Sequence, residues 1–143
     1  MKSIGRVSLW VGLAAVLISS NVFAQPPYKF GDATHLLDGT GLYYQYQTGD
    51  AAHVTFDNGL MSYEWVAGAG KGRSDKDIPY NSRQIEENVY LVQWDQKDHP
   101  DFMTLYIDLN KRIIYSSGVR LYGTPTQSAV FDGGIIQHIE TEE

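Results

Sequence analysis

The chain has 143 residues, of which 13% are aromatic and none is cysteine, and its formal net charge is −6 at pH 7. The absence of cysteine excludes disulfide stabilisation and thiol catalysis. The negative charge disfavours long-range attraction to other polyanions, so we expect the protein to bind neither nucleic acid nor a membrane surface.

The first 24 residues have the three-part pattern of a secretory signal peptide. Lys2 and Arg6 form a positive start, residues 9–18 form a short apolar run, and residues 22–24 provide a permissive cleavage site. A helix that spans a bilayer needs roughly 20 apolar residues, so the length of this run disfavours an uncleaved anchor. We therefore expect a mature chain of residues 25–143 that folds as one domain and is periplasmic or secreted.

The mature chain alternates aromatic or β-branched runs with turn residues, which is typical of many short strands. The predicted strands, in chain order, are Leu42–Tyr46, His53–Phe56, Leu60–Val66, Asn88–Asp95, Phe102–Leu109, Arg112–Val119 and Gly134–Ile139. A short helix is also expected near residues 34–37. The connection Asp57-Asn58-Gly59 has the composition of a two-residue hairpin turn. This spacing of strands and turns predicts an all-β fold.

Two of the predicted strands carry large side chains at every second position. Alternate residues of a strand point to the same face of a sheet. The residues concerned are Met61, Tyr63 and Trp65 in the first strand and Tyr90, Val92, Trp94 and Gln96 in the second. Other strands are apolar or aromatic on both faces, which suits a sheet that encloses an interior. We therefore predict a small antiparallel β-barrel of the calycin or lipocalin type, with an internal cavity.

The glycine-rich segment GAGKGRSDKD, residues 68–77, is locally basic in an acidic chain. It lacks the Gly-Lys-Ser/Thr ending and the following helix of a phosphate-binding loop. We expect instead a mobile loop at the mouth of the barrel, where Arg73 would attract an anionic group of a ligand. The alternative for Arg73 is a surface ion pair with Asp75 or Asp77.

No motif for a metal, a cofactor or a nucleophile is recognisable. The four histidines lack metal-binding spacing, and the acidic residues 95–101 lack the ligand spacing of a calcium loop. No serine lies in a Gly-x-Ser-x-Gly motif. We therefore predict neither a metal nor a cofactor.

Four segments resemble the MoaF-like domain family, whose members are small calycin-type β-barrels. They are FDNGL at residues 56–60, GKGRSDKDIPYNSRQIEENVYLVQW at 70–94, TLYIDLNKRIIYSS at 104–117 and FDGGIIQHIE at 131–140. The resemblance implies a MoaF-like β-barrel domain over residues 25–143. It implies no particular reaction.

A more distant similarity to phenolic acid decarboxylases bears on mechanism. That family uses two tyrosines and an arginine to hold a carboxylate, and a glutamate to move protons. Here the tyrosine positions are Val54 and Phe56, the arginine position is Arg73 and the glutamate position is Gln96. Valine and phenylalanine donate no hydrogen bond and glutamine exchanges no proton, so the comparison implies that decarboxylation is lost. The shorter spacing between the Asn-Gly turn and Arg73 implies a missing or reduced strand.

We therefore predict a binding protein, and not an enzyme, for a small aromatic or apolar molecule with an anionic group. The predicted ligand-binding residues are Val54, Phe56, Trp65, Arg73, Tyr90, Trp94, Gln96 and Tyr106. Plain core packing is the alternative for each aromatic ring. Two other functions stay open: an enzyme with Tyr63, Tyr90 or Tyr106 as acid or base, and a module for homodimerisation or protein interaction.

Overall fold

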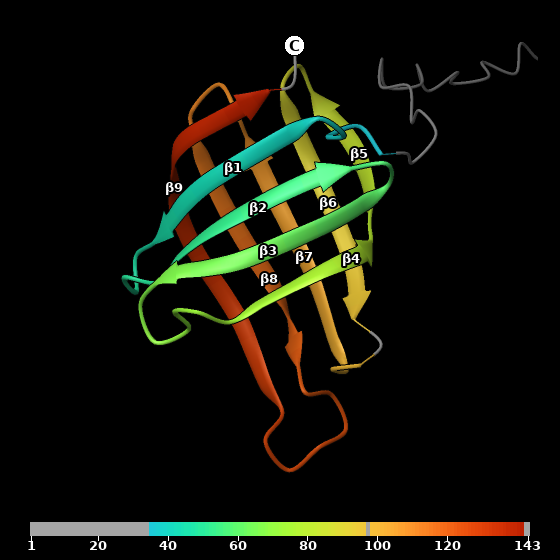
Figure 1. The fold of residues 1–143 in the computed structure, drawn as a ribbon, viewed down its shortest axis with the longest axis vertical. Coiled ribbons are helices and arrows are strands. Elements are labelled where there is room, and N and C mark those ends of the chain that lie inside the picture. Colours follow the sequence, from blue (N-terminus) through green and yellow to red (C-terminus); the bar gives the residue numbers. More distant parts are fainter. Residues whose placement is uncertain (1–34, 97, 142–143) are drawn as a thin grey trace, which may run out of the picture.

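The computed structural model describes residues 35–96 and 98–141, which form nine antiparallel strands (Figure 1). The strands are β1 (Thr40–Tyr46), β2 (Ala51–Asp57), β3 (Leu60–Ala67), β4 (Ser74–Pro79), β5 (Asn81–Glu86), β6 (Val89–Gln96), β7 (Asp101–Asp108), β8 (Ile113–Arg120) and β9 (Ser128–Thr141). The predicted leader, residues 1–24, lies outside the described residues. In the part of the chain that is described, no helix has the length and apolar character to cross a membrane.

All nine strands belong to one sheet with the order β4-β3-β2-β1-β9-β8-β7-β6-β5. Figure 1 shows that the sheet curls into two layers, with β1–β4 lying across β6–β8. The long strand β9 passes from one layer to the other, and the register between β1 and β9 shifts at Tyr43 and Tyr44. The two edge strands, β4 and β5, follow one another in sequence and are separated only by Tyr80. The prediction of an all-β, calycin-like barrel is confirmed.

The β2–β3 hairpin has the turn that its sequence predicts. Asn58 and Gly59 have φ angles of 49° and 76°, and this pair of positive values is typical of a type I′ turn. The backbone N–H of Gly59 donates to both carboxylate oxygens of Asp38, at 3.1 and 3.0 Å. Residues 36–39 form a separate turn before β1, so the helix predicted near residues 34–37 is not present in its described part. The Asp38 side chain therefore fixes the turn before β1 on the β2–β3 hairpin.

Two strands, β4 and β5, were not predicted from the sequence. Residues 68–77 were expected to form a mobile loop, but β4 begins at Ser74 and pairs with β3, for example Tyr63 with Asp75. The hydrogen bonds between β3 and β4 are made by backbone groups, so this pairing does not require alternating apolar side chains. Charged side chains, as in β4, are common on edge strands. Of the residues of β4, only Ile78 is buried.

One half of the barrel interior is filled by apolar side chains. Leu37, Phe56 and Tyr80 are each no more than 2% exposed, and the rings of Phe56 and Tyr80 lie 4.9 Å apart. The remaining members of this core come from all parts of the sheet and include Leu42, Ile78, Val92, Ile107, Ile114 and Ile136. The other half of the interior is hollow, and it contains the candidate site.

Candidate ligand-binding cavity

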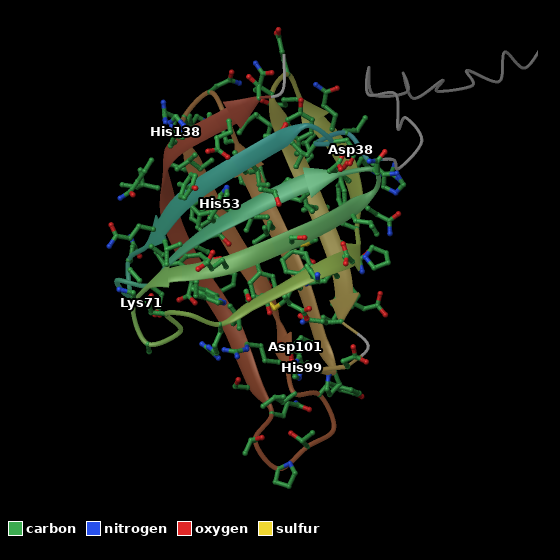
Figure 2. All side chains as sticks on the ribbon, in the orientation of Figure 1. Asp38, His53, Lys71, His99, Asp101 and His138 are labelled. Atoms are coloured by element: carbon green, nitrogen blue, oxygen red, sulfur yellow. The ribbon has the colours of Figure 1, made fainter. Side chains whose placement is uncertain are left out.

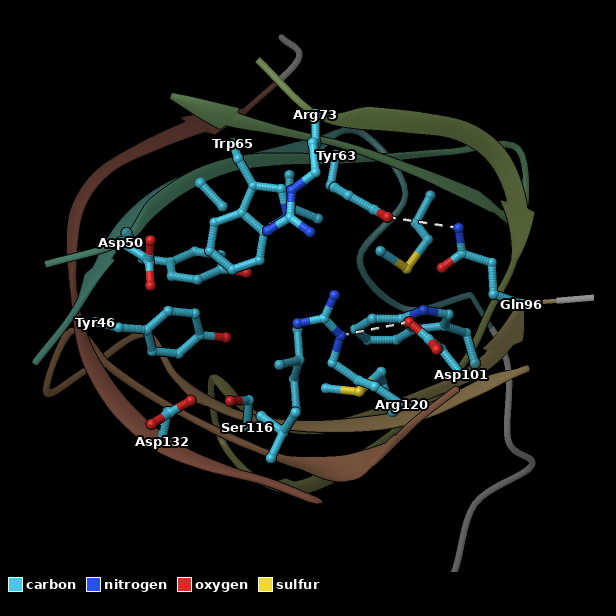
Figure 3. A pocket seen from close by; sticks show the side chains of 18 of the residues that line it. Tyr46, Asp50, Tyr63, Trp65, Arg73, Gln96, Asp101, Ser116, Arg120 and Asp132 are labelled. Carbon is cyan, nitrogen blue, oxygen red and sulfur yellow. Dashed lines mark hydrogen bonds and ion pairs between the residues drawn. The ribbon is translucent and has the colours of Figure 1, made fainter. Parts of the chain in front are cut away.

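A cavity of about 180 Å³ occupies the barrel interior at the end where β1, β3, β6 and β8 finish (Figure 3). An apolar cavity of about 150 Å³ is enough to hold benzene in another protein. The enclosed space therefore suits a ligand body of about one ring. It does not suit a long acyl chain or a large polycyclic molecule.

Aromatic rings form much of the wall of this cavity. The rings of Tyr44 and Tyr46 meet edge to face at 5.2 Å, and those of Tyr46 and Trp65 lie 6.1 Å apart. Burial raises the pKa of the Tyr44 and Tyr46 phenols, so both remain protonated at neutral pH. These residues can therefore offer a ligand both ring faces and neutral hydroxyl groups.

Two guanidinium groups point into the opening (Figure 3). Arg120 is paired with Asp101, with 3.7 Å between Nε and Oδ2. Arg73 Nε donates to the backbone oxygen of Gly70 at 3.4 Å, and within the described residues it forms no ion pair. The alternative, a surface ion pair of Arg73 with Asp75 or Asp77, is not formed. Arg73 is thus available to an anion at the mouth.

Gln96 lies where the cavity wall passes from β6 to the edge strand β4. Its side chain is buried and Nε2 donates to a carboxylate oxygen of Asp75. The same nitrogen lies 3.5 Å from the hydroxyl of Tyr63 on β3. An amide in this position can orient neighbouring groups, but it cannot act as an acid or a base near neutral pH.

Two buried polar atoms of the wall have no hydrogen bond of good geometry to any described residue. They are Nε1 of Trp94, in a residue that is 7% exposed, and Oγ of Ser116, in a residue that is 1% exposed. A buried polar group without a partner costs about 1–3 kcal/mol. The cavity therefore offers two points at which a polar atom of a ligand, or a water molecule, would be stabilising.

The structure brings together five of the eight predicted binding residues. Val54, Trp65, Arg73, Trp94 and Gln96 line the cavity.

The other three predicted binding residues do not line the cavity. Phe56 belongs to the filled half of the interior, and Tyr90, near the start of β6, also packs on the core. Tyr106 alternates with the buried Leu105 and Ile107, which places it on the outside of the sheet, with its ring 6.1 Å from that of Tyr115. Alternation in the sequence of β7 already places Tyr106 on the face opposite Leu105 and Ile107, so the residues on the face of Leu105 were the better candidates for the cavity wall.

Several lining residues were missed by sequence reasoning. They are Tyr44, Tyr46, Asp50, Asp101, Ser116, Arg120 and Asp132. Tyr44 and Tyr46 alternate with polar positions in β1, a signal that could have identified them. The charged residues come from separate strand ends and turns, and no sequence spacing relates them.

Metal-binding side chains do not gather in this structure. The described residues contain no group of three His, Asp or Glu side chains that could hold a metal ion. Figure 2 shows His53 and His138 on the barrel wall and His99 near the opposite end of the molecule.

Comparison with known proteins identifies the family and supports the fold. Residues 38–121 match the family described as MoaF-like. A crystal structure of a protein from Burkholderia vietnamiensis, assigned provisionally as a beta-lactamase, is similar with a TM-score of 0.60 and 13% identity, over 74% of this chain and 95% of that chain. At this identity the likeness concerns the fold alone, and no curated protein matches the chain. Because the family match covers more than half of the 143 residues, the chain belongs to the MoaF-like family.

Proposed function

We propose that this barrel binds a small, largely apolar or aromatic molecule with an anionic group, and that it releases the molecule unchanged. The observation that carries the proposal is Arg73, which stands without an ion pair among the described residues at the mouth of an aromatic-lined cavity. A guanidinium group recognises carboxylate or phosphate through paired hydrogen bonds. The apolar body would fill the enclosed space beyond it.

Binding without turnover is supported by the chemistry of the wall. Under the expected similarity to phenolic acid decarboxylases, Gln96 replaces their proton-transferring glutamate, and its side chain donates a hydrogen bond to Asp75. The buried phenols of Tyr44 and Tyr46 hold their protons more tightly than usual, which suits donors and not general bases. Export of the protein, expected from residues 1–24, is also proposed; mass spectrometry of the natural N-terminus would test it.

The test is a thermal-melt screen of the purified protein against small aromatic and aliphatic acids, with and without an amino group. A ligand that binds only the native state stabilises it by about 2.7 kcal/mol at 100 times its Kd. We expect some acids to raise Tm in the natural protein and the rise to shrink in Arg73→Gln. The matched control is Lys71→Gln, since Lys71 comes from the same segment but does not line the cavity.

Two results would overturn the proposal. One is the absence of any shift across the screen. The other is an equal shift in Arg73→Gln and Lys71→Gln, which would show that the acids act on surface charge and not in the cavity. Recovery of unchanged ligand after prolonged incubation would support binding over catalysis.

A further inference from the structure

Two carboxylates flank Tyr46 inside the cavity. The backbone N–H of Tyr46 donates to the carbonyl oxygen of Asp50 at 2.8 Å, and that of Gln47 donates to Gly133, the residue after Asp132, at 3.0 Å. Both side chains line the cavity, and Figure 3 shows them on the Tyr46 side, whereas Asp101 lies across the opening beside Arg120. The cavity therefore has an acidic side as well as a basic opening.

Neither of these carboxylates is compensated by a cation within the described residues. Asp50 accepts hydrogen bonds from the backbone of Ala69 at 2.7 Å and from Thr48 Oγ1 at 3.3 Å, so its geometry is fixed. The Asp132 side chain forms no ion pair or hydrogen bond with another described residue. Asp101, by contrast, already has Arg120 as its partner. A cationic group of a ligand would thus find its partners at Asp50 and Asp132.

An independent observation at the same place is the hydroxyl of Ser116. Ser116 faces Asp132 across the β8–β9 ladder and is 1% exposed, and its Oγ has no hydrogen bond of good geometry among the described residues. Its hydroxyl is close enough to the Tyr46 phenol to oppose the rise in pKa that burial causes there. Figure 3 shows the two side chains next to one another below Tyr46. A protonated amine has three N–H donors, so one group could satisfy both the carboxylate and this hydroxyl oxygen.

The aromatic rings on this side would also favour a cation. The Tyr46 ring lies within 6.1 Å of Trp65, and the faces of such rings attract ammonium groups. Burial raises the pKa of Tyr46, and the nearby charge of Asp132 adds to this effect.

We infer that the ligand is a zwitterion, with a protonated amine facing Asp50 and Asp132, an anionic group at Arg73 and an apolar body of about one ring. This inference rests on the proposed function and narrows its ligand class. A molecule with an anionic group alone would leave two carboxylates without a cation in the same small space. A zwitterion supplies an opposite charge to each side.

The test compares three probes that share a phenyl ring, by isothermal titration calorimetry on the purified protein. Phenylalanine carries both charges, 3-phenylpropionate lacks the amine and 2-phenylethylamine lacks the acid. We expect phenylalanine to bind at least about tenfold more tightly than either single-charge probe, as is typical when a charge-assisted hydrogen bond is lost.

Substitution of each carboxylate tests whether Asp50 and Asp132 cause the tighter binding of phenylalanine. Asp132→Asn and Asp50→Asn should each weaken the binding of phenylalanine by about tenfold, because the partner of the amine is removed. The same variants should leave the binding of 3-phenylpropionate unchanged or tighter, because this probe has no amine and loses a like charge nearby. Asp57→Asn is the matched control, since Asp57 is exposed on the β2–β3 turn and lies outside the cavity. Melting curves of the free variants check that each is folded.

The outcomes separate the inference from the proposed function. If 3-phenylpropionate binds as tightly as phenylalanine, or if Asp132→Asn and Asp50→Asn both behave as Asp57→Asn does, the zwitterion is overturned while binding of an acid stands. If none of the three probes binds, a phenyl-sized zwitterion is overturned as well. The proposed function fails on a different result, the absence of Arg73-dependent stabilisation across the whole screen.

Discussion

Gln96 on β6 donates a hydrogen bond to Asp75 on β4, and this contact joins two strands that share no backbone ladder. Among the described residues no backbone ladder joins the two edge strands β4 and β5, which are connected in sequence through Tyr80. The barrel therefore has a seam at this point that is held by side chains. The cavity lies next to this seam, since Gln96 and Tyr63 are part of its wall.

Gln96→Glu should destabilise the protein. The carboxylate cannot donate to Asp75 and would face a like charge, so we expect a loss of about 1–3 kcal/mol in the free energy of unfolding at neutral pH. Urea denaturation measures this loss. The deficit should shrink in mild acid, where one carboxyl is protonated. Gln93→Glu, on the same strand but outside the cavity lining, is the control; an equal loss in both variants would contradict the role of the seam.

Tyr80→Phe should also be destabilising, because the Tyr80 hydroxyl connects the turn at residues 36–39 to the core. It donates to Asp38 at 2.7 Å and accepts from the N–H of Leu37 at 3.3 Å. Removing it leaves a buried N–H without this acceptor, at a cost of about 1–2 kcal/mol by chemical denaturation. Tyr122→Phe, at a residue that is 68% exposed, should change stability little. An unchanged free energy of unfolding in Tyr80→Phe would contradict this role of the Tyr80 hydroxyl.

Stability should fall steeply in alkali. Burial raises the pKa of Tyr44, Tyr46 and Tyr80, so the folded state keeps these protons where the unfolded chain releases them, above about pH 10. The unfolded state then binds fewer protons, and the free energy of unfolding decreases as pH rises. Denaturation at increasing pH, followed by phenolate absorbance, checks this. Tyr44→Phe should flatten the decline, whereas Tyr122→Phe should leave it unchanged.

Acid should also destabilise the protein, because it weakens the interaction of Asp108 with Lys111 at the β7–β8 turn. The backbone N–H of Lys111 donates to Asp108 Oδ1 at 2.8 Å and lowers the pKa of this carboxyl, and Lys111 Nζ lies 3.2 Å from Oδ2. A lowered pKa stabilises the fold above about pH 4, and the effect is lost as pH falls further. Asp108→Asn should therefore flatten the acid limb of the stability curve measured by denaturation. An unchanged limb, matching that of Asp57→Asn, would refute this.

Strand alternation and turn chemistry in the sequence determined much of the fold. Alternate large residues identified one face of β3 and one of β6, and the structure turns Met61, Tyr63, Trp65, Trp94 and Gln96 inward on those faces. Asn58 and Gly59 specified the hairpin because their positive φ angles are accessible to few other residues. Alternation and turn composition depend only on residues that are neighbours in the sequence, so both can be recognised without knowledge of the rest of the chain.

Only the tertiary structure decided which inward residues meet in a hollow. Phe56 and Val54 point to the same interior, yet Phe56 lies in the filled half and Val54 in the cavity. Alternation reports the face of a sheet, whereas depth along the barrel axis depends on register and curl. The charges show the same limit. Arg73 lies directly before β4, Asp50 lies in the turn before β2, and Asp132 lies in β9. They line one cavity because strands that are distant in sequence pair in the curled sheet.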